Sequence, residues 1–169
     1  MITEIFWIVG VRRGGLGIAP RPRGGDWLDA EVRAWRAAGV DCVVSVLTPD
    51  EEAELGLSGE KEVCQKHGLQ FAAMVIPDRG VPKNASHLIR VLDAITGNLT
   101  AGKKVVIHCR QGIGRSSLVA ASALIALGED ADRAFSRVEQ ARGCQVPDTD
   151  EQRVWVREFA RKLAIKQAQ

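Results

Sequence analysis

The sequence predicts a single α/β domain over residues 1–169, with a central, mostly parallel β-sheet flanked by helices on both faces. Three observations favour this fold class. Apolar, β-branched runs alternate along the chain with segments that repeat apolar residues at helical spacing. The length suits one hydrophobic core, and no internal repeat, low-complexity tract or linker divides it. Two strand-like runs are apolar almost throughout, which is typical of strands covered on both faces.

The first elements follow from apolar spacing and from residues that begin or end helices. Residues 4–9 are rich in β-branched and apolar side chains and predict a strand. Asp26 is suited to cap a helix with an apolar face, and Gly39 is suited to end it. Residues 41–46 predict the next strand.

The middle of the chain continues the alternation. Ser58 is suited to cap a helix that ends at Gly68. Residues 69–76 form the first of the two nearly continuous apolar runs and are expected to be a covered strand. Residues 84–99 repeat apolar side chains at helical spacing and predict a longer helix.

The second continuous apolar run, residues 104–108, leads into the part of the chain expected to be most buried. Residues 116–127 are apolar nearly all round, which marks a helix in the middle of the domain. Amphipathic helices are expected at 131–142 and 149–164. Sheets of this class bind ligands at the carboxyl ends of their strands. The segment that follows residue 108 is therefore the place to expect a site.

Composition and charge exclude several classes of protein. Hydrophobic residues make up 46% of the chain and charged residues 26%, as in an ordinary soluble globular protein. The net charge of +2 comes with no basic run, so neither nucleic acid nor a membrane surface is expected as a partner. The apolar stretch at the start is too short for a signal peptide, and residues 118–127 cannot span a bilayer. We therefore expect a cytoplasmic protein.

The four cysteines, Cys42, Cys64, Cys109 and Cys144, are scattered, with no C-x-x-C pair. This spacing favours neither a zinc site nor a disulfide framework, so no metal or cofactor is expected. Three of the four have a simple interpretation as small buried or inert thiols. An alternative for Cys144 is a resolving thiol that protects Cys109 as a disulfide. Cys109 itself is set apart by its neighbours.

Directly after the strand at 104–108 the chain reads His108-Cys109-Arg110-Gln111-Gly112-Ile113-Gly114-Arg115-Ser116. Gly112 and Gly114 allow a tight loop whose backbone N–H groups turn inward and bind an anion. The N-terminus of the next helix adds unsatisfied donors and a positive dipole end. Arg115 supplies a planar fork for two phosphate oxygens. This positive field is expected to make Cys109 a thiolate and a nucleophile. Ser116 is placed to hydrogen-bond that thiolate when it leaves.

The pattern H-C-x-x-G-x-x-R-S, between a strand and a helix, resembles the signature of the cysteine-based protein tyrosine phosphatase superfamily. Residues 16–21, 33–46 and 149–152 are similar, more loosely, to small atypical dual-specificity phosphatases. The resemblance implies a protein tyrosine phosphatase-like fold. It also implies metal-independent hydrolysis of phosphotyrosine, and of phosphoserine and phosphothreonine, through a cysteinyl-phosphate intermediate. Cys109 would be the nucleophile and Arg115 the phosphate clamp. The implied partners are a phosphorylated protein substrate and phosphate or vanadate as ligand, and the implied assembly is a monomer.

The same resemblance implies a general acid, because an alkoxide or phenoxide leaves poorly unless it is protonated. Asp78 lies in a loop before Cys109, at a spacing similar to that of the acid in the dual-specificity branch. Taken alone, Asp78 between Pro77 and Gly80 also suits an ordinary turn. His108 precedes the nucleophile as in the family, where this histidine holds the loop and tunes the thiolate without transferring protons.

Residues 146–152 fall where the tyrosine-specific members carry two glutamines that position the hydrolytic water. Gln152 matches the second glutamine, whereas Asp148 stands where the first would be, so a role for Asp148 departs from the family pattern. The alternative interpretation is the start of a helix, since Asp148 or Thr149 suits an N-cap.

Four arginines surround the predicted site: Arg21, Arg23, Arg79 and Arg110. Arg79 and Arg110 flank it, either as contacts for acidic or multiply phosphorylated substrates or simply as solvated side chains. Arg21 and Arg23 are expected at the lip of the pocket. The chain lacks the extra segment with which the large tyrosine-specific enzymes deepen their pocket, and this favours a shallow site.

Three alternatives to a protein phosphatase remain open. A phosphatase of lipid or nucleotide phosphates would use the same loop, but the lipid-directed branch resembles a loop with lysines, and here the variable positions hold Arg110, Gln111 and Ile113. A catalytically silent phosphate-binding module would normally lack the nucleophile, the arginine or the acid. A sulfur transferase is disfavoured by the spacing from Cys109 to Arg115.

Overall fold

Strands and helices alternate along the computed structural model, which describes residues 2–169 and leaves Met1 outside the described part. The order is β1 (Phe6–Ile8), β2 (Gly15–Ala19), a short 3-10 helix η1 (Gly25–Trp27), α1 (Leu28–Ala37), β3 (Val40–Ser45), α2 (Pro49–Glu54), α3 (Glu60–Lys66), β4 (Gln70–Ala73), α4 (Ala85–Thr100), β5 (Lys104–His108), α5 (Arg115–Ala126), α6 (Ala131–Arg142) and α7 (Asp150–Ala168).

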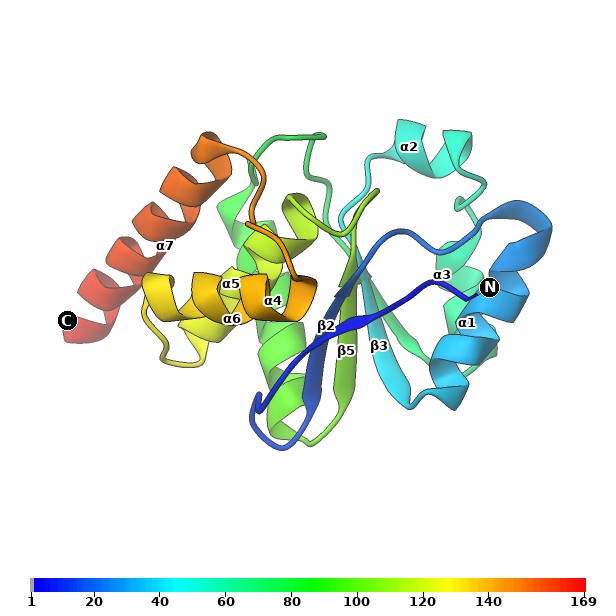
Figure 1. Ribbon diagram of the computed structural model, residues 1–169, viewed down its shortest axis with the longest axis horizontal. Helices are drawn as coiled ribbons and strands as arrows, with labels where there is room; N and C mark the ends of the chain where they lie inside the picture. Colours follow the sequence, from blue (N-terminus) through cyan, green and yellow to red (C-terminus); the bar gives the residue numbers. More distant parts are fainter. Residues whose placement is uncertain (1) are drawn as a thin grey trace.

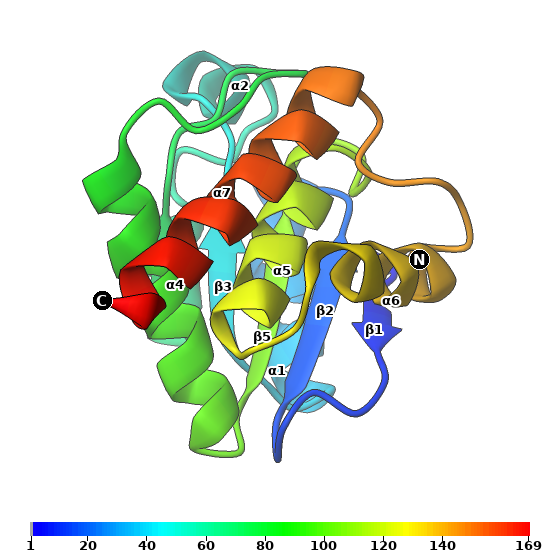
Figure 2. The same cartoon turned by 90° about the vertical axis from the view of Figure 1, so that its left-hand side faces the viewer.

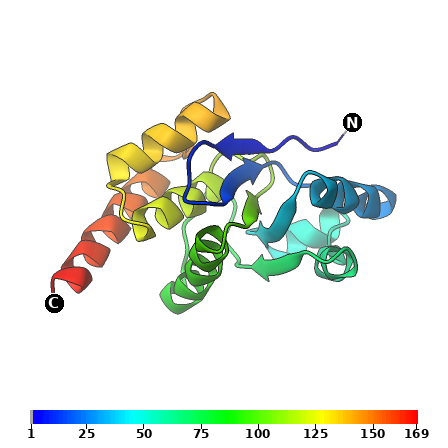
Figure 3. The ribbon, with the colours of Figure 1, turned by 90° about the horizontal axis from the view of Figure 1, so that it is seen from below.

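The five strands form one sheet in the order β1-β2-β5-β3-β4. All neighbours are parallel except β1 and β2, which are antiparallel at one edge. Helices α1 and α3 pack on one face, α4, α5 and α6 cover the other, and α7 packs on the outer side of α5 and α6 (Figures 1 and 3). The predicted fold class, a mostly parallel sheet flanked by helices on both faces, is confirmed.

Two buried clusters, one on each face, hold these layers together. Side chains alternate along β5, so that Val105 and Ile107 enter the cluster under α4 and α5, while Val106 enters the cluster under α1 and α3. In the first cluster α5 is buried along nearly its whole length, and Figure 2 shows it lying between α4, α6 and α7. This position confirms the central helix predicted from the apolar run.

Strand β2 and helix α2 were not predicted. The segment of β2 is rich in glycine and lacks the alternation of an ordinary strand. Gly17 is favoured by packing, because a Cβ there would lie 2.5 Å from Ile5 Cγ2 and 3.1 Å from the Trp7 ring on the neighbouring strand. Helix α2 is only six residues long and strongly acidic, so it has no apolar face to reveal it.

Several predicted boundaries were wrong. Asp26 lies inside η1, and α1 begins after it without a side-chain cap. Gly59, and not Ser58, is the N-cap of α3. The run at residues 69–76 gives a shorter strand than predicted, β4, which α3 and α4 contact on opposite faces but which is only partly buried, since its first and last residues are exposed at the edge of the sheet. By contrast, Thr149 does cap α7 through a hydrogen bond from the backbone N–H of Gln152. Within residues 2–169, no helix has the length and apolarity needed to cross a membrane.

Candidate active site

The loop from Cys109 to Gly114 connects the carboxyl end of β5 to the N-terminus of α5, at the upper end of the sheet in Figure 1. The segments that follow β3 and β4 end at the same edge, because these three strands are parallel. They bring α2 and the loop at residues 76–80 beside the 109–114 loop. The start of α7 completes the surroundings.

Backbone geometry fixes the shape of this loop. Gly112 has a φ of 68°, a conformation that favours glycine. A Cβ at this position would lie 2.6 Å from the carbonyl carbon of Ala19 and 2.7 Å from the nitrogen of Pro20, so there is no room for a side chain. In this conformation the Gly112 N–H points inward and donates to Cys109 Sγ over 3.2 Å. On the outer side, Arg142 of α6 donates from Nε to the Gly112 carbonyl over 2.9 Å.

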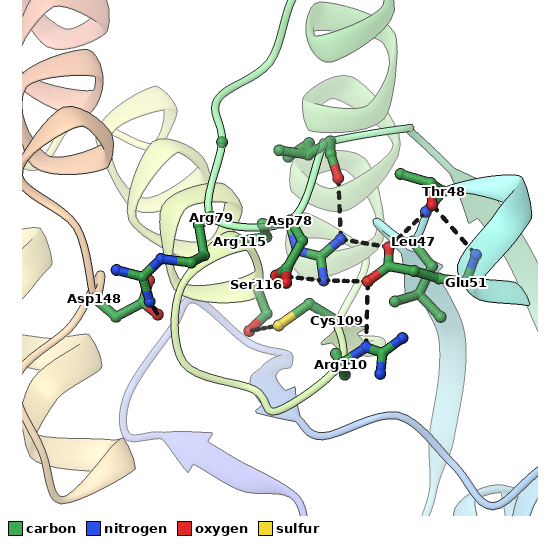
Figure 4. Close-up of polar contacts among 12 residues, drawn as sticks. Leu47, Thr48, Glu51, Asp78, Arg79, Cys109, Arg110, Arg115, Ser116 and Asp148 are labelled. Atoms are coloured by element: carbon green, nitrogen blue, oxygen red, sulfur yellow. Dashed lines mark hydrogen bonds and ion pairs between the residues drawn. The ribbon is translucent and has the colours of Figure 1, made fainter. Parts of the chain in front are cut away.

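The Cys109 thiol is buried and surrounded by donors. Its Sγ lies 3.3 Å from the Ser116 hydroxyl, as Figure 4 shows. Burial opposes ionisation, but hydrogen bonds from the Ser116 hydroxyl and from the backbone N–H groups of Ser116 and Ile113 outweigh it. Together with the charge of Arg115, they lower the pKa of the Cys109 thiol. The predicted thiolate therefore has a physical basis in these contacts.

Arg115 is a buried cation, only 2% exposed, and it is held from two sides. Nη1 donates to Glu51 Oε2 over 2.7 Å and to the Ile76 carbonyl over 3.0 Å, and Nη2 donates to Glu51 Oε1 over 2.8 Å (Figure 4). Nη2 also lies 3.2 Å from Asp78 Oδ1. The contacts with Glu51 and Asp78 are all made by Nη1 and Nη2 of Arg115.

Glu51 was missed in the sequence. The Arg115 hydrogen bonds, together with the Thr48 backbone N–H, overcome partial burial and lower the pKa of Glu51 to about 2. A local signal does exist, because Thr48 and Glu51 form a capping box at the start of α2. The Glu51 N–H donates to Thr48 Oγ1 over 3.3 Å, and the Thr48 N–H donates to Glu51 Oε2 over 2.9 Å. Threonine and glutamate at this spacing, directly after a strand, would have identified the helix and its carboxylate.

Asp78 lies beside the nucleophile, as predicted. Its side chain is 63% exposed and contributes to the wall of the cavity above Cys109. The turn also exists, since the Gly80 N–H donates to the Pro77 carbonyl over 2.8 Å. The turn is therefore confirmed, and the role of general acid stays a prediction. Asp78 is a turn residue whose carboxylate faces Arg115.

The two residues predicted to position water also reach the loop. Gln152 is fully buried and donates from Nε2 to the Gly80 carbonyl over 3.0 Å, while its Oε1 has no hydrogen-bond partner. Asp148 pairs with Arg79 over 3.5 Å, across the mouth of the cavity (Figure 4). The Asp148 Oδ1 and Gln152 Oε1 atoms lie against Gly114, so that there is no space for a Cβ at this position. The start of α7 is therefore packed against the loop.

The four flanking arginines divide into two groups. Arg110 pairs with Glu51 over 3.4 Å and with Glu54 over 2.8 Å, so it is neither free nor simply solvated. Arg79 pairs with Asp148. Arg23 instead pairs with Glu31, away from the cavity, and Arg21 donates to its neighbour's carbonyl. Neither Arg21 nor Arg23 lines the cavity, but the Arg21 N–H donates to the Arg110 carbonyl over 3.3 Å and so lies beside the loop, and the lip stays a prediction.

The cavity above the loop measures about 140 Å³. It is lined by Asp78, Arg79, Cys109, Arg110, Gln111, Ile113, Gly114, Arg115, Asp148 and Gln152. Three of the predicted site residues, Gly112, Ser116 and His108, are outside this lining, and each of them contacts Cys109. Among residues 2–169 no cluster of histidine, cysteine and acidic side chains is arranged to hold a metal ion.

Known proteins with a related sequence were found by comparison. A family model described as Cyclin-dependent kinase inhibitor 3 (CDKN3) matches residues 28–135. Cyclin-dependent kinase inhibitor 3 from Rattus norvegicus is 28% identical over 131 residues, which are 76% of this chain and 61% of the relative. The Homo sapiens protein gives the same values. The matched region thus spans less than two thirds of the length of these relatives.

Solved structures share the whole fold. Kinase associated phosphatase (KAP), with its catalytic-site cysteine replaced by serine, superposes with a TM-score of 0.84 at 22% identity and covers 97% of both chains. Tk-PTP in its active form superposes with a TM-score of 0.75 at 25% identity, over 94% of this chain and 97% of the other. The predicted protein tyrosine phosphatase-like fold is confirmed.

Proposed function

The chain belongs to the Cyclin-dependent kinase inhibitor 3 (CDKN3) family, and from this membership and the geometry around Cys109 we propose that it is a cysteine-dependent protein phosphatase. One observation carries the proposal. Cys109 Sγ lies inside a loop whose N–H groups point inward, with a lowered pKa and with the buried guanidinium of Arg115 beside it. This arrangement suits an attack on phosphorus better than any other reaction.

The substrate phosphate would bind in the loop, with its oxygens on the inward N–H groups and on Arg115. In doing so it replaces the Asp78 carboxylate, which lies 3.2 Å from Nη2 of Arg115. The Cys109 thiolate then attacks phosphorus, the bond from phosphorus to the ester oxygen breaks, and Asp78 in its acid form gives its proton to the departing oxygen. The product of this step is a cysteinyl phosphate.

Water completes the reaction. Asp78, now a carboxylate, takes a proton from the attacking water, while the unpartnered Oε1 of Gln152 accepts the other proton of that water in a hydrogen bond. The bond from sulfur to phosphorus breaks, and the Ser116 hydroxyl stabilises the thiolate that leaves. No step requires a metal ion, since the buried guanidinium and the loop N–H groups balance the phosphate charge.

The proposed substrates are proteins phosphorylated on tyrosine, and on serine or threonine. A cavity of about 140 Å³, bounded by short loops, admits the short side chains as well as the long one. The relatives are named cyclin-dependent kinase inhibitor and kinase associated phosphatase, which makes a phosphorylated kinase a reasonable protein to include among the substrates tested.

The direct test is hydrolysis by purified protein of phosphotyrosine, phosphothreonine and phosphoserine peptides in EDTA, beside phosphoinositides and nucleotides. We expect release of phosphate from peptides and inhibition by vanadate. Cys109→Ser should abolish turnover, because a hydroxyl keeps the shape of the site but is not ionised, and vanadate binding should survive. Retained turnover in Cys109→Ser would contradict the covalent mechanism. Activity on phosphoinositides alone would move the proposal to a lipid phosphatase.

A further inference from the structure

A buried carboxylate stands behind the phosphate-binding loop. Glu60, the first residue of α3, is 1% exposed, and its Oε1 lies 2.8 Å from Nε2 of the fully buried His108. On the other side of the ring, His108 Nδ1 lies 3.3 Å from the carbonyl oxygen of Cys109. The imidazole ring therefore connects a side chain of α3 to the backbone of the nucleophile.

Both ring nitrogens of His108 face oxygen atoms that accept hydrogen bonds. A neutral imidazole carries a single N–H and satisfies only one of them, whereas an imidazolium donates to both. The second proton is favoured here because Glu60 supplies the opposite charge, so that the buried pair is neutral overall. Burial alone would lower the pKa of His108, but the charge and hydrogen bond of Glu60 outweigh it and raise that pKa.

We propose that Glu60 is a positioning residue for the nucleophile: it keeps His108 doubly protonated, and the imidazolium holds the Cys109 carbonyl and favours the thiolate. The inference rests on the proposed function in taking Cys109 as the nucleophile. A carbonyl fixed by Nδ1–H does not turn toward the sulfur, where its oxygen would repel a thiolate. The positive end of the pair also lies nearer Cys109 than the negative end does, because the ring stands between them.

None of the other groups described around this pair supplies both the negative charge and the hydrogen bond that Glu60 gives to His108. Glu52 of α2 is near enough to interact with both partners, but partial burial and the charge of Glu60 raise its pKa, and it makes no hydrogen bond to the ring. Cys64, one turn along α3, is a buried thiol whose pKa burial raises to about 12. The Trp35 ring, with its centroid 6.3 Å from that of His108, packs beside the imidazole.

From the side of the loop, Arg115 is the charged group that acts on Cys109, and Asp78 is bound to it. The second oxygen of Glu60, Oε2, is buried without a hydrogen-bond partner. Among the described residues, the Glu60 carboxylate thus makes its one side-chain hydrogen bond with His108. A substitution that removes its charge therefore acts mainly on His108.

The test compares Glu60→Gln with Glu62→Gln, which removes the same charge from an exposed position on the same helix. The readout is the rate at which iodoacetamide alkylates Cys109 as a function of pH, followed by mass spectrometry of the peptide that contains it. Glu60→Gln should move the reactivity curve to higher pH, so that alkylation below the midpoint slows by about tenfold, which corresponds to one pKa unit. Glu62→Gln should leave the curve unchanged.

Coupling to His108 separates positioning from general damage. In a His108→Asn background, Glu60→Gln should have no further effect on alkylation. In the protein that keeps His108, Glu60→Asp should be alkylated faster than Glu60→Gln, because aspartate keeps the negative charge. The wild-type protein offers a measurement that needs no variant, since ¹⁵N NMR at neutral pH should find protons on both ring nitrogens of His108.

A His108 ring with a single proton in the wild-type protein would overturn the proposal, and so would an unshifted curve in folded Glu60→Gln. Alkylation needs no phosphate ester, so its result is independent of the proposed function. If no phosphate ester is hydrolysed but the curve shifts, the phosphatase assignment fails and the role of Glu60 stands. If esters are hydrolysed but the curve does not shift, only the role of Glu60 fails.

Discussion

At the scale of single residues, the site depends on buried charges that hold one another. Arg115 is bound by both oxygens of Glu51, and this fixes the plane of the guanidinium before any substrate arrives. Preorganised donors stabilise a developing charge without reorganising at the moment of reaction. The geometry of the guanidinium should therefore matter as much as its charge.

Arg115→Lys tests this directly. The variant keeps the charge but loses the planar fork, so kcat/KM on a phosphopeptide should fall by roughly 10²–10³. Arg90→Lys, an exposed change on α4, is the matched control and should behave as wild type. A loss of only a few-fold in steady-state assays would show that Arg115 acts as a simple point charge.

Asp78→Asn tests the general acid. The variant should lower kcat strongly on alkyl and aryl phosphates whose leaving groups need a proton, and much less on an ester whose leaving group departs as a stable anion. The basic limb of the pH–rate profile should flatten, while the acidic limb, which reports the Cys109 thiol, should remain. Asp93→Asn, on the surface of α4, provides the control.

Equal losses on every substrate, with both limbs kept, would leave Asp78 as a turn residue. Asp148 would then be the first acid to examine, because it also lines the cavity.

Sequence reasoning located most of these residues because their chemistry is concentrated in one short segment. Cys109, Arg115 and Ser116 lie within a single loop and helix start, so a local pattern was sufficient. Glu51 and Glu60 meet their partners across 64 and 48 residues of sequence, and nothing near Arg115 or His108 indicates which distant carboxylate will reach them. Such pairs depend on the topology of the sheet.

At the scale of elements, the phosphate-binding loop is shaped by its packing against β2. Gly112→Ala should therefore lower the free energy of unfolding for two reasons. The φ of 68° is unfavourable for alanine, and the new Cβ would meet the backbone of Ala19. Gly143→Ala is a matched control, since its φ of 78° carries a similar strain but a Cβ there meets nothing within 4 Å.

In urea denaturation we expect Gly143→Ala to lose about 1 kcal/mol and Gly112→Ala clearly more. Only Gly112→Ala should also lose phosphatase activity and alkylation of Cys109. Equal losses of stability for the two variants, with activity kept in both, would mean that the contact with β2 does not shape the loop.

The elements that could be predicted are those whose pattern is repeated. Helices α4 and α5 show several turns of apolar spacing, and their predicted ranges agree with the structure within about two residues. Strand β2 and helix α2 are too short to repeat a pattern. Strand β2 depends on its neighbours β1 and β5, whereas α2 begins with a local capping box, and only the partner of Glu51, Arg115, is distant in the sequence. A sequence read locally gives no access to those neighbours.

At the scale of the whole molecule, the charged pairs of the site join segments that are far apart in the sequence and meet at the carboxyl edge of the sheet. Glu51 links α2 to the start of α5, and Glu60 links α3 to the end of β5. The carboxyl edge of the sheet is thus held together by the same charges that are proposed to serve the reaction. Acid should therefore loosen the fold and the site together.

Glu51→Gln measures this link. Glu51 has a folded pKa of about 2, below its ordinary value of 4.5, so it stabilises the folded state fully above pH 4.5 and loses that contribution as pH falls toward 2. At pH 7 the variant should be less stable by about 2–3 kcal/mol in urea denaturation. The difference should shrink through the window from pH 4.5 to 2, because wild-type Glu51 becomes protonated there.

Glu54→Gln, an exposed partner of Arg110 on the same helix, should change stability little at any pH. A gap between Glu51→Gln and wild type that stayed constant down to pH 2 would show that Glu51 stabilises α2 through packing and its helix cap, and that its charge on Arg115 contributes nothing to the fold.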